Sequence, residues 1–226
     1  MSVVMLSGTL QDYLKAIYCL EKEAGGVSAS LLSRTLGVSL PSVTSMMRKL
    51  ATRKLVSYTP YLSIALTRAG ERQALEVVRH HRLLETYLQK ALGFSLETVH
   101  GEADRLEHAM SEELEEKIDS YLGHPAFDPH GSPIPDSAGR VKPRQLVALT
   151  DLDAGEHGVV RQITCREPGQ LHHLESVGLV PGAAVRVVSA DAGSGIVRVQ
   201  ISSAAEEPIG ATVASCILVS RTGGAQ

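Results

Sequence analysis

Hydrophobic residues near the amino terminus recur at helical spacing, and polar residues and glycines divide them into short helices. The pattern predicts helices over 9–21, 28–36 and 41–53, with the second helix capped by Ser28 and closed by Gly37. Two short helices joined by a tight turn are typical of a helix-turn-helix. The amino-terminal part therefore predicts a small helical domain built around this motif.

Two short apolar segments, 55–58 and 64–66, flank a turn at 59–61 and predict a β-hairpin directly after the third helix. A hairpin in this place completes a winged helix. Helical periodicity then returns in three stretches, over 67–92, 95–110 and 111–122.

Composition changes after these helices. Residues 123–140 hold four prolines and three glycines, which favours a loop or linker over a packed element. Beyond them, alternating apolar residues at 159–163, 184–188 and 196–201 indicate a small β-barrel. The expected fold class is mainly α with a C-terminal small β-barrel, divided into a winged helix at 1–70, a helical domain at 71–122, a linker at 123–141 and a β domain at 142–226.

The composition is that of an ordinary globular chain of 226 residues, 43% of them apolar, with room for two or three small domains. No apolar run approaches the ~20 residues of a membrane helix, and no signal-peptide pattern is present, so we expect a cytoplasmic protein without a membrane partner. Cys19, Cys165 and Cys216 are widely spaced, and we expect them to be buried apolar residues.

The formal net charge of −3 is unevenly distributed along the chain. Residues 24–70 carry six Lys or Arg and no Asp or Glu, whereas 95–122 hold nine carboxylates against two basic residues. A solvated surface explains either region alone. A basic winged helix beside an acidic helical region, however, favours a polyanion such as double-stranded DNA as the partner.

Four side chains that can bind metals fall at positions i, i+4, i+7 and i+8 of one predicted helix: His100, Asp104, Glu107 and His108. His81 and Glu85 form a second pair at helical spacing. Single residues of these types are usually solvated charges or structural histidines, but four on one face predict a metal site. Imidazole and carboxylate donors without a nearby cysteine favour Mn2+ or Fe2+ over a zinc thiolate or copper(I) site.

Catalysis has little support in the sequence. Glu97-x-x-His100 is half of the pattern in di-metal helical-bundle enzymes, which need a second copy on a paired helix, and that copy is missing. No Ser or Cys nucleophile stands beside a base. We therefore expect neither an enzyme nor a small-molecule substrate.

The order of these motifs resembles the diphtheria toxin repressor family of iron- and manganese-dependent regulators. The resemblance runs from the winged helix through His81-Arg-Leu-Leu-Glu85 and residues 99–111 to His124-Pro-x-x-Asp-Pro-His-Gly-x-Pro-Ile-Pro135. Leu174-Glu-Ser-Val-Gly-Leu-Val-Pro-Gly182 is similar to an SH3-like domain that the family shares with small ferrous-iron transport proteins. The likeness covers nearly the whole chain and implies a metal-binding and dimerisation domain at 71–122 and an SH3-like domain at 142–226.

The resemblance also implies two metal sites. The primary, activating site would take one ligand from the first helix and three from the acidic helix: Asp12, Asp104, Glu107 and His108. The ancillary site would combine helical residues with two residues of the SH3-like domain: His81, Glu85, His100, Glu167 and Gln170.

Two positions differ from the iron-responsive members of that family, which usually carry methionine where Asp12 stands and cysteine where Asp104 stands. Many manganese-responsive members carry carboxylates there, and hard oxygen ligands at both positions favour Mn2+ over softer ions. Lys15 stands where the short manganese regulators have a further carboxylate, so their two-metal primary site is not implied.

A cation shared by Asp12 and the acidic helix would fix the winged helix against the dimer core, so that the recognition helices of a homodimer match major grooves about 34 Å apart. The residues expected to contact DNA lie in or beside the third helix: Ser39, Pro41, Ser42, Ser45, Arg48, Lys49 and Arg53. Short hydroxyl side chains read bases weakly, so DNA shape is expected to contribute to recognition.

The sequence thus predicts a homodimeric, manganese-responsive repressor of metal-uptake genes that binds a double-stranded DNA operator. Two alternatives stay open: an iron-responsive member of the same family, and a constitutive DNA-binding protein with a structural metal. Metal-dependent DNA affinity separates the second alternative from both sensor functions.

Overall fold

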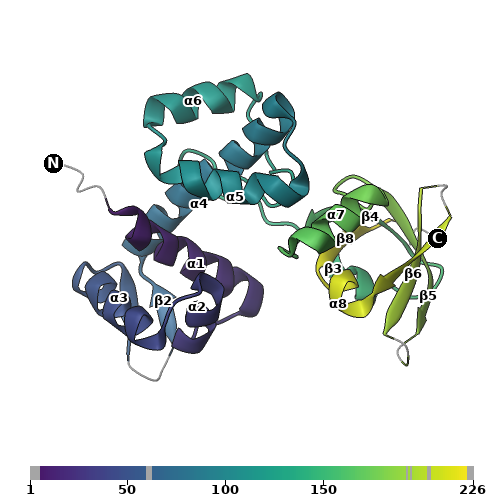
Figure 1. The fold of residues 1–226 in the computed structure, drawn as a ribbon, viewed down its shortest axis with the longest axis horizontal. Helices are drawn as coiled ribbons and strands as arrows, with labels where there is room; N and C mark the ends of the chain where they lie inside the picture. The colour runs from purple at the N-terminus through teal and green to yellow at the C-terminus, as the bar shows by residue number, and fades with distance from the viewer. Residues whose placement is uncertain (1–5, 60–62, 192, 194, 203–204, 223–226) are drawn as a thin grey trace. The chain divides into compact units, whose positions relative to one another are not determined.

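The computed structural model describes residues 6–59, 63–191, 193, 195–202 and 205–222 (Figure 1). The chain divides into two compact units. The first comprises Met1–His81, Leu106–Ser111 and Pro135–Arg140, and the second comprises Arg82–Arg105, Glu112–Ile134 and Val141–Gln226. Among the described helices, none is both long and apolar enough to cross a membrane.

The first unit begins with three helices in the predicted order: α1 (Gly8–Ala24), α2 (Ala29–Leu36) and α3 (Leu40–Thr52). Their apolar faces bury Leu14 and Met47 completely. These side chains come from different helices, so removing their surface from water stabilises the helix-turn-helix as one body.

Capping interactions set the ends of these helices. Ser28 Oγ accepts a backbone hydrogen bond at 3.1 Å at the start of α2, and Gly37 ends α2 with a φ of +65°. The N-cap of α3 is Ser39, whose Oγ accepts from the Ser42 backbone nitrogen at 3.3 Å. The helix therefore begins one residue before Pro41, where the sequence had predicted its start.

The wing follows α3 directly. Strands β1 (Val56–Tyr58) and β2 (Ile64–Leu66) pair antiparallel. Glu21 Oε1 accepts a hydrogen bond from the Leu66 backbone nitrogen at 3.0 Å, which connects α1 to the wing. Pro60 and Tyr61, in the predicted turn, lie outside the described residues. The predicted winged helix is confirmed.

Three further helices follow the wing: α4 (Arg68–Leu92), α5 (Leu96–Leu106) and α6 (Glu112–Tyr121). The prediction that α5 extends to about Met110 was wrong, because the chain tightens into a 3₁₀ helix, η1 (Glu107–Ala109). At this point Glu107 is buried and contacts Lys15 and His81, which are distant in sequence, and we infer that these contacts favour the tighter turn. The four metal-competent residues therefore do not share one α-helical face.

The proline- and glycine-rich segment 123–140 has no helix or strand apart from one isolated bridge, but it is packed. Arg79 donates a hydrogen bond to the Pro135 carbonyl at 2.8 Å, and Asp128 and His130 are buried. The expectation of a loop rather than a packed element was wrong in this respect. Side-chain donors satisfy carbonyls that a helix or strand would otherwise pair.

The C-terminal β-rich region holds a six-stranded antiparallel sheet in the order β3-β8-β4-β5-β6-β7. Its elements are β3 (Val147–Ala148), the 3₁₀ turn η2 (Leu149–Asp151), β4 (His157–Ile163), α7 (Pro168–Ser176), β5 (Ala184–Asp191), β6 (Ile196–Ile201), β7 (Glu206–Gly210), α8 (Ala211–Ala214) and β8 (Ile217–Arg221). Fully buried side chains from several strands and from α7, including Val187, Val199, Val219 and Leu174, form its core.

The predicted fold class, helical domains followed by a small β domain, is confirmed, but the sheet is open. No pairing joins edge strands β3 and β7 within the described residues. Closing a barrel requires the two edge strands to pair, and β3 is only two residues long.

Gly70 in α4 allows this helix to approach the backbone before the wing. A Cβ at Gly70 would lie 1.9 Å from the Leu55 carbonyl oxygen, so Gly70→Ala should lower the free energy of unfolding by at least about 1–3 kcal/mol. The matched control is Gly101→Ala in α5, where a Cβ meets nothing within 4 Å and alanine should stabilise the helix by up to about 1 kcal/mol. Urea unfolding measures both, and a Gly70→Ala protein as stable as the parent would contradict this packing.

Candidate metal centre

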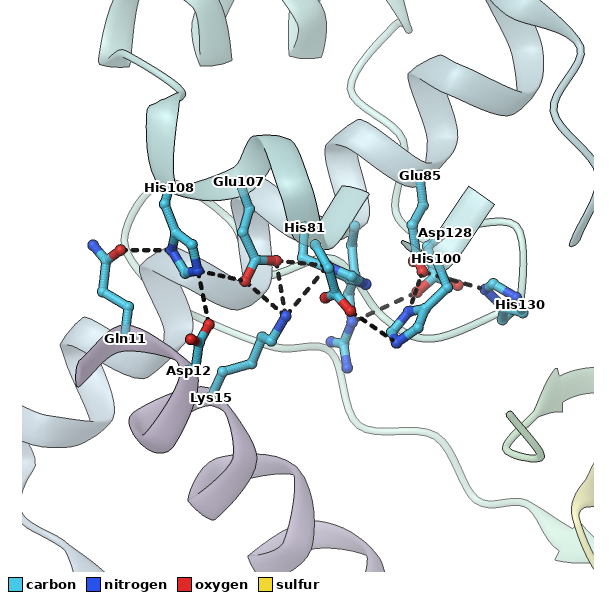
Figure 2. A network of polar contacts seen from close by, with 12 residues as sticks. Gln11, Asp12, Lys15, His81, Glu85, His100, Glu107, His108, Asp128 and His130 are labelled. Carbon is cyan, nitrogen blue, oxygen red and sulfur yellow. Dashed lines mark hydrogen bonds and ion pairs between the residues drawn. The ribbon is translucent and has the colours of Figure 1, made fainter. Parts of the chain in front are cut away.

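Three donor residues converge within the first unit: Asp12 from α1, and Glu107 and His108 from η1 (Figure 2). Their ligand atoms all lie within 4.8 Å of one another. His108 Nε2 is 2.7 Å from Asp12 Oδ1 and 3.6 Å from Glu107 Oε1. Two carboxylates and one imidazole are a donor set that fits a divalent first-row cation.

Two residues that the sequence analysis did not identify position the His108 ring. Its Nδ1 lies 2.7 Å from Gln11 Oε1, and because an amide oxygen only accepts, Nδ1 carries the proton and Nε2 faces Asp12. Gly8 leaves room for the ring, since a Cβ there would lie 3.0 Å from His108 Cδ2. A glutamine and a glycine near a candidate ligand carry too little chemical signal to be found by motif.

Glu107 is the most constrained member of the cluster. Lys15 Nζ donates to both of its carboxylate oxygens, at 2.7 and 2.8 Å, and His81 Nδ1 donates to Oε2 at 2.6 Å. The Glu107 side chain is completely buried, and the lysine side chain is only 18% exposed. Both partners offset the free energy cost of burying this carboxylate.

Asp104, the fourth predicted primary ligand, belongs to the second unit. It lies on α5, its side chain is 46% exposed, and its Oδ2 is 3.6 Å from His100 Nε2. The three-residue cluster of Asp12, Glu107 and His108 thus assembles within the first unit by itself. Participation of Asp104 in that site stays a prediction.

Two predicted ancillary ligands meet in the second unit. His100 Nδ1 lies 3.0 Å from Glu85 Oε1, and the Glu85 side chain is almost fully buried (Figure 2). The predicted partner His81 belongs to the first unit, where it contacts Glu107. Glu85 lies in the stretch of α4 over 77–86 where nearly every residue is buried.

Glu85 also takes part in a buried cluster that the sequence analysis did not name as a site, together with Asp128 and His130. The ligand atoms of these three residues lie within 4.8 Å of one another. His130 Nε2 donates to the Leu96 carbonyl at 3.2 Å, so its Nδ1 faces Glu85 Oε1 at 3.7 Å. The only sequence signal was the Asp-Pro-His run in a segment expected to be a linker.

Burial and neighbouring charges shift the pKa values of this cluster. Desolvation and the charge of Glu85 raise the pKa of Asp128 to about 6, against the opposing effects of Arg82 and His130. Burial lowers the pKa of His130, but a hydrogen bond to Glu85 and the charges of Glu85 and Asp128 outweigh it and raise the pKa overall. A divalent cation bound here would displace protons.

The two ligands predicted from the β domain lie on α7. Glu167 is the exposed N-cap residue, and Gln170 is half-buried in the first turn. A different polar contact connects α7 with α5, because His172 Nδ1 lies 3.5 Å from Glu97 Oε2. A role for Glu167 and Gln170 at the ancillary site stays a prediction.

The residues predicted to contact DNA are exposed on or beside α3: Ser39, Pro41, Ser42, Ser45, Arg48, Lys49 and Arg53. Ser39 Oγ lies 2.8 Å from Ser42 Oγ, so these hydroxyls also serve the helix cap. Leu40, which the sequence analysis did not select, is 48% exposed and lines a shallow groove with Pro41, Thr44, Ser45, Arg48 and Lys49. Basic side chains can contact the phosphates of DNA, and small apolar side chains can contact the methyl groups of thymine bases.

Comparisons with known proteins establish the family. Residues 5–64 match "Iron dependent repressor, N-terminal DNA binding domain", residues 67–136 match "Iron dependent repressor, metal binding and dimerisation domain", and residues 147–221 match the FeoA domain. The iron-dependent repressor IdeR of Mycobacterium leprae (strain TN) is 33% identical over 207 residues, which cover 85% of this chain and 89% of that repressor. The chain belongs to the diphtheria toxin repressor family.

This repressor has further relatives among curated proteins and solved structures. The diphtheria toxin repressor of Corynebacterium efficiens is 31% identical over 187 residues, covering 80% of this chain and 81% of that protein. A solved structure titled "Manganese-dependent transcriptional repressor complex with manganese" is 37% identical, with a TM-score of 0.89 and coverage of 94% of this chain and 100% of that chain. The chain is thus a metal-dependent DNA-binding repressor with a dimerisation domain, in a family of transcriptional regulators rather than enzymes.

The raised pKa values in the second unit of this repressor predict a pH-dependent stability. The folded chain binds the Asp128 proton more tightly than the unfolded chain does, so Asp128 should lower the free energy of unfolding as the pH rises from 3.8 to about 6. The raised pKa of His130 should also lower the free energy of unfolding as the pH rises above 6.5. Urea unfolding of metal-free protein across this range should show a smaller loss of stability in Asp128→Asn.

The control for this measurement is Asp153→Asn, which changes an exposed carboxylate of the same unit. It should follow the parent at every pH. If the stability of Asp128→Asn also follows the parent at every pH, then the pKa of Asp128 is not raised in the folded protein.

Proposed function

We propose that this repressor is activated by Mn2+ and represses genes for metal uptake. The observation that supports manganese is the donor set of Asp12, Glu107 and His108, which offers carboxylate oxygens and one imidazole nitrogen in mutual reach. Hard oxygen donors suit Mn2+ better than softer ions. The similarity to a manganese-dependent repressor solved with manganese is consistent with this choice.

Metal would act by joining segments that are far apart in the sequence. Asp12 belongs to α1 of the winged helix, and Glu107 and His108 belong to the turn that follows α5. A bound cation supplies two positive charges that attract both carboxylates. These residues would hold it and thereby fix the winged helix in one arrangement, which favours the DNA-binding state of the dimer.

Additional ligands complete this proposal. Asp104 is the proposed fourth ligand of the primary site. The proposed ancillary site comprises His81, Glu85, His100, Glu167 and Gln170, and the contact of Glu85 with His100 supports its core. The proposed domain limits remain 1–70, 71–122, 123–141 and 142–226.

DNA recognition would use the exposed surface of α3 in both protomers. Arg48, Lys49 and Arg53 would contact phosphates, and the residues at the start of the helix would approach base edges. The acid-free sequence 24–70 gives this surface its positive charge.

Iron is the main alternative activator, because several of the curated relatives are named iron-dependent repressors. A constitutive DNA-binding protein with a structural metal is the other. Titration of DNA binding with Mn2+ and, without oxygen, with Fe2+ distinguishes these functions, since a constitutive protein would show no dependence on free metal concentration.

Removing a ligand of the proposed primary site should remove activation. Asp12→Asn or His108→Ala should require at least about a hundredfold more Mn2+ to bind a promoter fragment, because the first loses the negative charge of a ligand and the second loses a ligand outright. Replacing even a residue that only supports a ligand lowers metal affinity by about 10–100-fold. Fluorescence anisotropy of labelled DNA measures the midpoint, and Asp153→Asn is the control with the same type of change at an exposed position. Midpoints equal to that of the parent in both variants would refute the site.

Metal preference should follow the chemistry of two ligands. The double variant Asp12→Met with Asp104→Cys should shift the ratio of activation midpoints from Mn2+ towards Fe2+, because sulfur replaces oxygen at both proposed ligands. The readout is the same DNA-binding titration under anaerobic conditions. Identical ratios in parent and variant would show that these side chains do not select the metal.

A further inference from the structure

Lys15 places an ammonium group beside the proposed primary cluster. It lies on α1, one helical turn after the candidate ligand Asp12, and its Nζ contacts both oxygens of the candidate ligand Glu107 at 2.7 and 2.8 Å. The same Nζ lies 3.4 Å from His81 Nδ1 (Figure 2). All four residues belong to the first unit.

This contact differs from an ordinary surface ion pair. The Glu107 side chain is completely buried and that of Lys15 is 18% exposed, so water screens their charges weakly. The Glu107 oxygen nearest to His108 Nε2, Oε1 at 3.6 Å, is the oxygen that Lys15 holds at 2.7 Å. A cation that binds Asp12, Glu107 and His108 must therefore share this oxygen with an ammonium group.

We propose that Lys15 is a built-in cation that lowers the affinity of the primary site for divalent ions and limits that site to one ion. The proposal rests on the proposed function of the site as the activating metal centre. The ammonium already neutralises Glu107, so a metal ion gains less from that carboxylate, and the two cations repel each other across a poorly screened distance.

The limit to one ion follows from the same contact. A second divalent ion that shared Glu107 would need free lone pairs on its carboxylate oxygens and a donor at the place where Lys15 Nζ lies. The Lys15 ammonium already contacts both oxygens, and it has no lone pair with which to bind a metal. The cluster then keeps one divalent ion and one lysine in place of two metals.

This arrangement would set the concentration at which the repressor responds. A weaker site stays empty until the free metal concentration is high, so uptake genes would be repressed only when metal is abundant. Lys15 would thus determine the affinity of the site without being a ligand.

The test compares charge and shape at this position in the full-length protein. Lys15→Met removes the charge and keeps an unbranched apolar side chain, whereas Lys15→Arg keeps the charge. Lys22→Met is the matched control on the same helix, where the lysine is exposed and lies over the Tyr18 ring. Equilibrium dialysis with metal analysis measures the Mn2+ affinity and stoichiometry of each protein without DNA.

Lys15→Met should bind its tightest Mn2+ at least about tenfold more strongly than the parent, since a full positive charge near a divalent ion is removed. Lys15→Arg and Lys22→Met should remain close to the parent. Equal or weaker binding by Lys15→Met would overturn the proposal, because Lys15 would then only order Glu107. If this variant does not fold without metal, Lys15→Gln, which keeps a hydrogen-bond donor without the charge, is subject to the same criterion.

Stoichiometry provides an independent readout. Lys15→Glu supplies a carboxylate where the ammonium stood, and it should bind one more Mn2+ per chain than the parent. An unchanged stoichiometry would refute the limit to one ion. If the parent itself binds no Mn2+ in dialysis, the proposed function fails; if the parent binds Mn2+ and the Lys15 variants match it, only the inference about Lys15 fails.

Discussion

A carboxylate buried away from water requires compensating positive charge, and the position of Glu107 imposes this requirement on the first unit. Lys15 from α1 supplies that charge and His81 from α4 a further hydrogen bond, so three segments distant in sequence meet at one side chain. The 3₁₀ turn that carries Glu107 also carries His108, whose ring reaches Asp12. The pairing of one buried acid therefore determines where the candidate ligands of the metal site lie.

Charge is partitioned in a way that matches a metal-activated DNA-binding protein. Residues 24–70 of the winged helix contain no Asp or Glu and present Arg48, Lys49 and Arg53 to solvent, where they can approach phosphates. Carboxylates are concentrated in the helical region, where they can be held together by cations. Two of these buried carboxylates are compensated in different ways: burial and the charge of Glu85 raise the pKa of Asp128, and Lys15 forms an ion pair with Glu107.

Local signals in the sequence were sufficient for most of the fold. Ser28, Gly37 and Gly93 mark helix ends through capping and positive φ angles, which depend on near neighbours alone. The sequence could not predict the end of α5, because the contact of Glu107 with Lys15 and His81 forms only in the folded chain. It also missed the packed 123–140 segment, since prolines exclude regular structure but do not exclude burial of Asp128 and His130. Gln11 and Gly8 were missed because they act through His108.

Anomalous X-ray diffraction from crystals of the full-length protein with Mn2+, recorded at the manganese absorption edge, tests the central claim most directly. The account predicts a single strong anomalous peak in the first unit, at bonding distance from Asp12 Oδ1, Glu107 Oε1 and His108 Nε2, with Lys15 still in contact with Glu107. A manganese-loaded protein that binds operator DNA while this cluster holds no anomalous peak would contradict it.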